Sequence, residues 1–333
     1  MCRDHALEFS IGHDRPQSRT ALAAGCPIVV KPAEATPLSA LALAVLAEEA
    51  GLPEGLFSVV TGKPQEIGSE FTSSPSVRKL SFTGSTAVGR MLMERCGATV
   101  KRLSLELGGN APFIVFADAD LDAAVAGAVV SKYRNAGQTC VCANRFYVHE
   151  AVYDTFLNKL VAAVARLEVG DGAAEGVQIG PLIDARAVAK VRDLIADAQS
   201  KGARVVLGEM PGPSAGAFVR PTIIANAHSG MRLSREEIFG PVAPVFKFHN
   251  EDKVVGLAND TEYGLAAYFY TRDIATVWRI YERLGYGMVG INTGLISTEV
   301  APFGGVKQSG FGREGARQGI DEYLSTKYGC FAL

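Results

Sequence analysis

The sequence lacks an excess of charge of one sign and lacks long apolar runs. Its 333 residues carry a formal net charge of −2, which gives no electrostatic reason to expect a nucleic-acid partner. The alanine-rich stretch 123–130 is too short to span a membrane, and no cationic start precedes an apolar stretch as in a secretory signal. We therefore expect a cytoplasmic protein that acts without membrane or nucleic acid.

Cysteine and histidine are also scarce. Six cysteines in a chain of this length do not form a disulfide framework, and the five scattered histidines show no zinc-site spacing. The expectation is a reducing compartment, no metal site, and thiols that remain available for chemistry. Hydrophobic residues at 48% and charged residues at 20% are ordinary for a globular protein, and the length allows two domains.

Apolar runs and helical stretches alternate along the chain. Strands are predicted at residues 28–30, 57–60, 79–82, 100–107, 113–116, 146–149, 205–207, 242–248, 267–270 and 288–291. Helices are predicted at residues 39–50, 87–96, 121–132, 152–167, 185–200 and 274–283. This alternation predicts an α/β fold with parallel sheets, a solvated loop at 208–216 and a domain boundary near Gly108 and Gly109.

The segment around Cys140 carries the strongest signal for chemistry. It places a thiol among small and polar residues at 135–145, between two predicted regular elements. Glu106 ends an apolar strand just before two glycines, a setting that favours a raised carboxyl pKa. A nucleophilic thiol and a carboxylate that moves protons suit covalent chemistry on carbonyl compounds. The competing interpretations are an inert buried cysteine and a surface glutamate.

Two further motifs are weak when taken singly. Gly84 and Ser85 lead from a strand into a helix whose free N–H groups suit a phosphate, or the segment is an ordinary capped turn. Lys31 and Glu34 follow another strand, where they suit ribose hydroxyls or belong to a solvated turn.

Taken together and in this order, these motifs resemble the aldehyde dehydrogenase superfamily from about residue 21 to the C-terminus. The segment 236–242 and the glycine-dense segment 302–315 complete the match. The resemblance implies a Rossmann-like cofactor domain without the usual glycine fingerprint, an α/β catalytic domain, NAD or NADP as cofactor, and a homo-oligomer. It makes Cys140 the nucleophile and Glu106 the general base. The implied cofactor-binding residues are Lys31, Glu34, Gly84, Ser85, Glu237 and Phe239.

Within that superfamily the chain looks most similar to the succinate-semialdehyde dehydrogenases. The residues that carry this similarity are 132–135, 140–142, 307–310 and 321–324, and by it Arg134 and Ser297 bind the distal carboxylate of the substrate. A structural ion pair is the alternative role of Arg134. Glutarate semialdehyde remains an alternative substrate, because one methylene group discriminates by only about 1–3 kcal/mol.

Two further expectations, one on the cofactor and one on redox chemistry, depend on single residues. Glu34 favours NAD over NADP, because a carboxylate accepts hydrogen bonds from a ribose 2′-hydroxyl and repels a 2′-phosphate. Cys142 is either a redox partner of Cys140, as the resemblance suggests, or a small packing residue.

Residues 1–20 match nothing in the family, which has a Pro-Trp-Asn-Phe-Pro motif there, while the only tryptophan here is Trp278. A permitted back-translation of residues 3–20, read one nucleotide later, gives AITPWNFPSAMIARKVGP. The hypothesis is therefore a frameshift near codon 20 and a chain that lacks the N-terminal part of the family, including the asparagine that donates to the developing oxyanion.

The expected layout has four parts: an aberrant N-terminus at 1–20, the remnant of the NAD(P)-binding domain at 21–107, the catalytic domain at 108–305, and a C-terminal return and oligomerisation segment at 306–333. The predicted function is NAD(P)-dependent oxidation of succinate semialdehyde to succinate. The alternatives are another aldehyde dehydrogenase, an inactive truncated remnant, and a cofactor-free thiol hydrolase, which the nucleotide motifs disfavour.

Overall fold

The chain forms two compact units, each with its own sheet. The computed structural model describes residues 2–5, 14–209 and 216–332. Unit 1 comprises Met1–Leu107, Ser297–Gly305 and Gly310–Leu333, and unit 2 comprises Gly108–Ile296 and Val306–Ser309. Unit 2 thus begins at Gly108, while residues 297–305, which the sequence layout grouped with the catalytic part, belong to unit 1.

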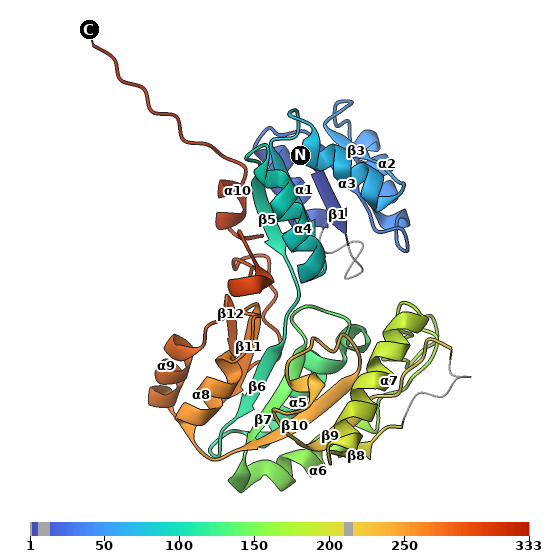
Figure 1. Cartoon of the computed structure of the whole chain (residues 1–333), viewed down its shortest axis with the longest axis vertical. Coiled ribbons are helices and arrows are strands. Elements are labelled where there is room, and N and C mark those ends of the chain that lie inside the picture. Colours follow the sequence, from blue (N-terminus) through green and yellow to red (C-terminus); the bar gives the residue numbers. More distant parts are fainter. Residues whose placement is uncertain (1, 6–13, 210–215, 333) are drawn as a thin grey trace. The chain divides into compact units, whose positions relative to one another are not determined.

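Unit 1 is built on a six-stranded sheet (Figure 1). Its strands are β1 (Cys2–His5), β2 (Ile28–Lys31), β3 (Phe57–Val59), β4 (Lys79–Thr83), β5 (Arg102–Glu106) and β13 (Gly310–Phe311). Its helices are α1 (Asp14–Ala23), α2 (Leu38–Glu49), α3 (Pro64–Ser73), α4 (Thr86–Gly97) and α10 (Gln318–Asp321). Two apolar clusters stabilise it, one around Phe71, Phe82 and Leu105 and one around Ile28 and Val30.

The strand order of unit 1 is β13-β5-β4-β1-β2-β3. The chain moves outward from β1 to β3, and β4 then pairs with β1 on its other side. The order therefore reverses between β1 and β4, and at such a switch point ligands bind beyond the carboxyl ends of parallel strands.

Unit 2 is built on a seven-stranded sheet with the order β12-β11-β6-β7-β10-β9-β8. Its strands are β6 (Ala111–Val115), β7 (Ala143–His149), β8 (Arg204–Leu207), β9 (Thr222–Ala227), β10 (Val242–Phe248), β11 (Ala266–Tyr270) and β12 (Met288–Ile291). Its α-helices are α5 (Leu121–Tyr133), α6 (Tyr153–Val164), α7 (Ala185–Ser200), α8 (Glu251–Asn259) and α9 (Ile274–Arg283). Its 3-10 helices are η1 (Arg134–Gly137), η2 (Glu150–Val152), η3 (Arg232–Ser234) and η4 (Lys307–Ser309).

The central strands of unit 2 carry its core. Every residue of β6 and β11 is buried, as expected for strands of a parallel sheet that is covered on both faces. Phe113 lies among Phe146, Tyr268 and Tyr270, with ring centroids 5.1 to 6.0 Å apart. This packing gives the candidate site a rigid support.

The α/β class predicted from the sequence is confirmed. The bounds of β10, β12, α7 and α9 agree with the predicted ranges. The expectation of purely parallel sheets is wrong at two edges, because β13 and β8 pair antiparallel with β5 and β9. The helices α1, α3, α8 and α10 and the strands β1, β9 and β13 were not predicted. Residues 210–215 of the predicted loop lie outside the described residues.

Among the described residues, no helix is long and apolar enough to cross a membrane.

Candidate functional site

The predicted residues of unit 1 gather at the carboxyl edge of its sheet. Lys31 is the last residue of β2, is 1% exposed, and its Nζ lies 2.7 Å from Oε1 of Glu34. Burial alone would raise the pKa of Glu34, but the hydrogen bond from Lys31 and the nearby positive charge lower it below its usual value. The pair presents a carboxylate that stays ionised and exposed.

Two more predicted residues follow β4 at the same edge. Ser85 caps α4, and its Oγ accepts a hydrogen bond of 3.4 Å from the Val88 amide. The Gly84 amide donates to the carbonyl oxygen of Glu106 over 2.9 Å. Glu106 is the last residue of β5 and is 2% exposed. Because β2, β4 and β5 run parallel, their carboxyl ends share one edge with the N-terminus of α4.

The predicted residues of unit 2 gather at the amino edge of its sheet, rather than at the carboxyl edge. Cys140 precedes β7, and Glu237 and Phe239 precede β10. The strands β7 and β10 are parallel neighbours, so these segments meet at the amino edge of the sheet. The α/β rule that places ligands at carboxyl ends would not have found this position.

The turn before Cys140 has an unusual backbone. Asn135, Ala136 and Gly137 have φ of 52°, 53° and 76°, so three successive residues are left-handed. Such a conformation costs a non-glycine residue roughly 1–3 kcal/mol and is retained only where the surroundings enforce it. A Cβ on Gly137 would lie 2.2 Å from the carbonyl oxygen of Gly240, so only glycine permits this approach of the two segments.

The thiols at 140 and 142 are enclosed. Cys140 is 6% exposed and Cys142 is 2% exposed. The Sγ of Cys142 lies 2.8 Å from Oγ1 of Thr139. A Cβ on Gly109 would lie 2.1 Å from the carbonyl oxygen of Cys140, which explains a glycine at that position. The backbone around Cys140 is thereby fixed from two sides.

Glu237 contacts Gly109, the glycine that approaches the Cys140 carbonyl oxygen. Its Oε1 accepts a hydrogen bond of 2.8 Å from the Gly109 amide. Burial raises the pKa of Glu237 to about 7, although this hydrogen bond and the charges of Lys190 and Lys132 favour the ionised form. Phe239 is left-handed with φ of 54°, a second strained residue at this edge.

The two residues predicted to bind a distal carboxylate are both exposed. Arg134 belongs to unit 2 and Ser297 to unit 1. Glu106 and Cys140 are likewise divided between the units, as are Lys31 and Glu237. The structure thus assembles one set of predicted residues at the carboxyl edge of β2, β4 and β5 and another at the amino edge of β7 and β10.

Three buried residues beside Cys140 were given no role by the sequence. Lys132 is 0% exposed, and its Nζ donates to Oδ1 of Asn144 over 3.0 Å. The hydroxyl of Tyr268 donates to the carbonyl oxygen of Val141 over 2.8 Å. A lysine at the end of the largely apolar stretch 121–133 was the available signal, because a buried ammonium group needs partners.

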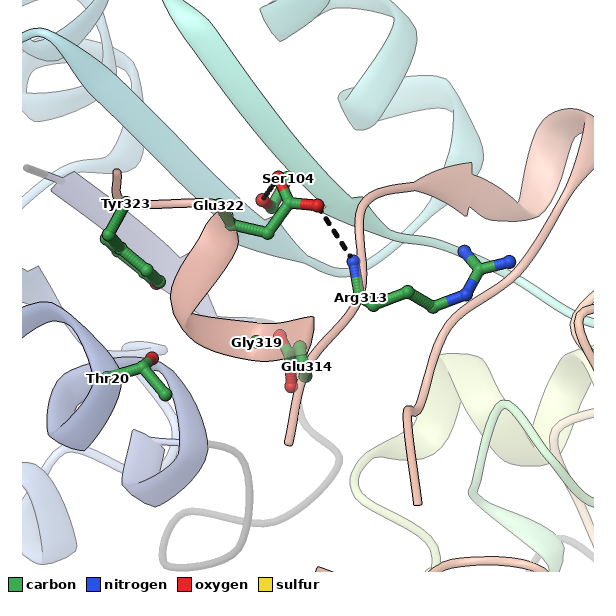
Figure 2. A pocket seen from close by; sticks show the side chains of 7 residues that line it. All are labelled: Thr20, Ser104, Arg313, Glu314, Gly319, Glu322 and Tyr323. Carbon is green, nitrogen blue, oxygen red and sulfur yellow. Dashed lines mark hydrogen bonds between the residues drawn. The ribbon is translucent and has the colours of Figure 1, made fainter. Parts of the chain in front are cut away.

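Unit 1 also holds a small polar pocket apart from the predicted residues. Figure 2 shows its lining side chains: Thr20, Ser104, Arg313, Glu314, Gly319, Glu322 and Tyr323. Glu322 accepts hydrogen bonds from the Ser104 hydroxyl over 3.2 Å and from the Arg313 amide over 3.2 Å. Lys79, at the start of β4, also hydrogen-bonds Ser104 and lies 3.7 Å from Glu322. These contacts fasten the C-terminal segment to the sheet of unit 1.

Within the described ranges, no group of three or more His, Cys, Asp or Glu residues is arranged to hold a metal ion.

Residues 17–328 match the sequence model of the Aldehyde dehydrogenase family. The chain is 63% identical over 310 residues to the glutarate-semialdehyde dehydrogenase of Pseudomonas aeruginosa, a match covering 93% of this chain and 64% of that protein. It is 61% identical over 313 residues to the succinate-semialdehyde dehydrogenase [NADP(+)] of Escherichia coli, covering 94% and 65%. The chain thus spans somewhat less than two thirds of these relatives.

The fold is similar to that of solved structures. The crystal structure of succinate-semialdehyde dehydrogenase from Burkholderia pseudomallei superposes with a TM-score of 0.98 at 60% identity. That match covers 100% of this chain and 69% of the other.

Proposed function

The chain belongs to the aldehyde dehydrogenase family, and on that premise we propose that it oxidises an aldehyde to a carboxylic acid through a thioester on Cys140. The observation that carries the proposal is the enclosed turn before β7, where three left-handed residues and two glycine contacts hold Cys140. A strained turn that rigidly supports a nucleophile is typical of an active site and is costly as mere packing.

Cys140 supplies the nucleophile in this proposal. Its thiolate adds to the aldehyde carbonyl to give a thiohemiacetal, and loss of hydride from the same carbon leaves a thioester. Glu106 takes a proton from the water that hydrolyses the thioester, which releases the acid and restores the thiol. The burial of Glu106 at the end of β5 supports a role as a base.

The carboxyl edge of unit 1 fits a dinucleotide. The N-terminus of α4, with Gly84 and Ser85, offers donors for phosphate oxygens, and Lys31 and Glu34 offer partners for ribose hydroxyls. Glu237 and Phe239 are proposed to hold the nicotinamide end. When bound, NAD or NADP supplies the hydride acceptor.

The exposed carboxylate of Glu34 favours NAD, because it would repel a 2′-phosphate. Its ion pair with Lys31 moderates that repulsion, so use of NADP is part of the same proposal.

The substrate is proposed to be a semialdehyde with a distal carboxylate. The exposed guanidinium of Arg134 lies six residues before Cys140 in sequence and suits a carboxylate, with Ser297 as a second donor. Succinate semialdehyde is the first candidate. Glutarate semialdehyde is the second, because the relative from Pseudomonas aeruginosa is named for it.

Residues 3–20 bear on how fast this chain turns over. We propose that they occupy the place of the family motif whose asparagine stabilises the oxyanion, and that the frame is shifted there. The competing proposal is a chain that has no activity for lack of this donor, since one oxyanion donor is worth roughly 10²–10³ in kcat.

The proposed assembly is a homo-oligomer in which the C-terminal segment takes part. Leu324, Tyr328 and Phe331 in that segment are 46%, 85% and 87% exposed. Large apolar side chains so exposed are typical of a surface that another chain covers.

The test is formation of reduced nicotinamide from succinate semialdehyde, glutarate semialdehyde and butanal, each with NAD and with NADP. The proposal expects activity with a semialdehyde that is lost in Cys140→Ser and kept in Cys142→Ser. Hydrolysis of an activated ester without any requirement for a cofactor, together with no oxidation of the three aldehydes, would favour the thiol hydrolase instead.

A further inference from the structure

A buried lysine lies near Cys142, two residues after the candidate nucleophile, and has no role in the proposed chemistry. Lys132 is the penultimate residue of α5, is fully buried, and donates from Nζ to Oδ1 of Asn144 over 3.0 Å. Burial lowers the pKa of Lys132 to about 8, while Cys142 and Glu237 nearby favour its charged form and Lys190 opposes it. An ammonium group in such a place is costly unless a negative partner compensates it.

A chain of hydrogen bonds leads from this lysine to Glu237. The amide of Asn144 accepts from Lys132 at its oxygen, so its nitrogen is left to donate to the carbonyl oxygen of Gly109 over 3.5 Å. The amide of Gly109 in turn donates to Oε1 of Glu237 over 2.8 Å. Asn144 is 2% exposed, so water does not compete strongly for these groups.

The two ends of this chain carry opposite charges, and burial disfavours both. Glu237 is half-buried as a whole, and the burial of its carboxyl group raises its pKa to about 7. Two lysines oppose that rise, Lys190 more strongly and Lys132 less strongly. Lys190 is exposed, where water and salt screen its charge, whereas Lys132 is enclosed.

We propose that Lys132 is a positioning residue for Glu237: its buried ammonium group stabilises the ionised form of the Glu237 carboxylate, and the link through Asn144 and Gly109 holds that carboxylate in place. This inference rests on the proposed function in one respect, namely that an ionised, fixed Glu237 is what a hydroxyl group of the cofactor requires. The electrostatic statement itself concerns only residues of unit 2.

The test is to titrate the Glu237 carboxylate directly. The full chain is labelled with glutamate carrying ¹³C at the side-chain carboxyl, and the Glu237 signal is assigned by its loss in Glu237→Gln. Lys132→Met removes the charge and the hydrogen-bond donor, whereas Lys132→Gln removes the charge but keeps a donor for Asn144. We expect both variants to raise the pKa of Glu237 by about one unit or more, equivalent to a tenfold change in its protonation equilibrium.

Lys190→Met is the matched control. It removes an exposed lysine near the same carboxylate, so we expect a smaller shift that disappears in high salt. The proposal is overturned if neither Lys132 variant shifts the titration, if only Lys132→Met does, or if Lys190→Met shifts it more. If one Lys132 variant fails to fold, the other decides.

Affinity for NAD and NADP, measured by calorimetry across the same pH range, separates this inference from the proposed function. We expect the pH midpoint of binding to rise together with the Glu237 titration in the Lys132 variants. If the titration moves and the affinity does not follow, Lys132 acts as inferred and the assigned role of Glu237 fails. If the titration does not move, the inference fails whatever the cofactor does.

Discussion

The two sheets use opposite edges for their candidate residues. In unit 1, Lys31, Gly84 and Glu106 lie at the carboxyl ends of parallel strands, the usual place for a ligand in an α/β sheet. In unit 2, Cys140 and Glu237 lie at the amino ends of β7 and β10.

The edges also differ in exposure and strain. At the carboxyl edge Glu34 and Ser85 are exposed, whereas Lys31 and Glu106 are buried, and Ser85 caps a helix with ordinary extended geometry. At the amino edge Cys140 is buried, and Asn135 and Ala136 are left-handed. An open edge with helix donors suits reversible binding of an anionic ligand, whereas a closed, strained edge suits a fixed nucleophile. The comparison therefore assigns binding chiefly to one edge and bond formation to the other.

The largest expected effect tests the proposal that residues 3–20 stand in place of a segment with an oxyanion donor. Replacing residues 3–20 with AITPWNFPSAMIARKVGP should raise kcat about 10²–10³-fold, because an asparagine donor is restored. The control carries the same replacement with alanine in place of the asparagine, at position 8. Equal turnover of the two replaced chains would contradict the oxyanion assignment.

A second prediction concerns Lys79, the buried lysine at the amino edge of the sheet in unit 1. Lys132 is its counterpart at the amino edge in unit 2. Burial lowers the pKa of Lys79 to about 8, with Glu322 favouring its charged form. Between pH 8 and 10.5 the unfolded lysine binds a proton that folded Lys79 does not, so the free energy of unfolding should rise with pH. Over that window the contribution is about 3 kcal/mol.

The Lys79→Met variant should lack this rise, as followed by urea denaturation at several pH values. Lys63→Met is the control, since Lys63 is exposed. Identical pH dependence in wild type and Lys79→Met would contradict the assignment. We also expect Lys79→Met to leave the cofactor affinity unchanged, because Lys79 helps to hold the C-terminal segment and does not lie among the proposed cofactor-binding residues.

The third prediction concerns selectivity for the substrate. Arg134→Met should lower kcat/KM for succinate semialdehyde by about 10–100-fold, because a charge-assisted hydrogen bond is lost. Butanal, which has no distal carboxylate, should be oxidised equally by both proteins. An equal loss with butanal would give Arg134 a structural role.

The smallest expected effect tests the open edge. Glu34→Ser should move the ratio of NADP to NAD affinity about tenfold toward NADP, because the repelling carboxylate is removed. Glu54→Ser removes an exposed carboxylate elsewhere in unit 1 and should leave the ratio unchanged. A change in kcat without a change in this ratio would argue against ribose binding by Glu34.

Local patterns predicted much of the fold, and the exceptions have physical causes. The spacing of apolar residues in 242–248 and 185–200 predicted β10 and α7 with the bounds that the structure has. The strand β9 (Thr222–Ala227) was missed because it follows a glycine- and proline-rich loop and contains a polar Asn226. Polar residues Cys2–His5 gave no strand signal, yet they pair with β2 and β4.

The candidate site was less accessible to sequence reasoning. Cys140 and Glu106 stood out in their local segments, while the resemblance to a family gave them their specific roles, and those roles remain proposals. No local pattern encodes the left-handed run 135–137 or the approach of Gly137 to Gly240, because both arise from packing between distant segments. The link from Lys132 to Glu237 joins residues far apart in sequence through Asn144 and Gly109. Only the three-dimensional structure brings them together.

The central claim is that Cys140 carries the oxidation of a semialdehyde. The most direct measurement incubates the chain with succinate semialdehyde and NAD, follows reduced nicotinamide, and traps the thioester for mass spectrometry. The measurement is made on the chain with its own residues 3–20 and on the chain in which these residues are replaced. We expect an acyl adduct on Cys140 and formation of reduced nicotinamide, and we expect both to be absent in Cys140→Ser. Turnover that persists in Cys140→Ser, or an adduct on another residue, would contradict it.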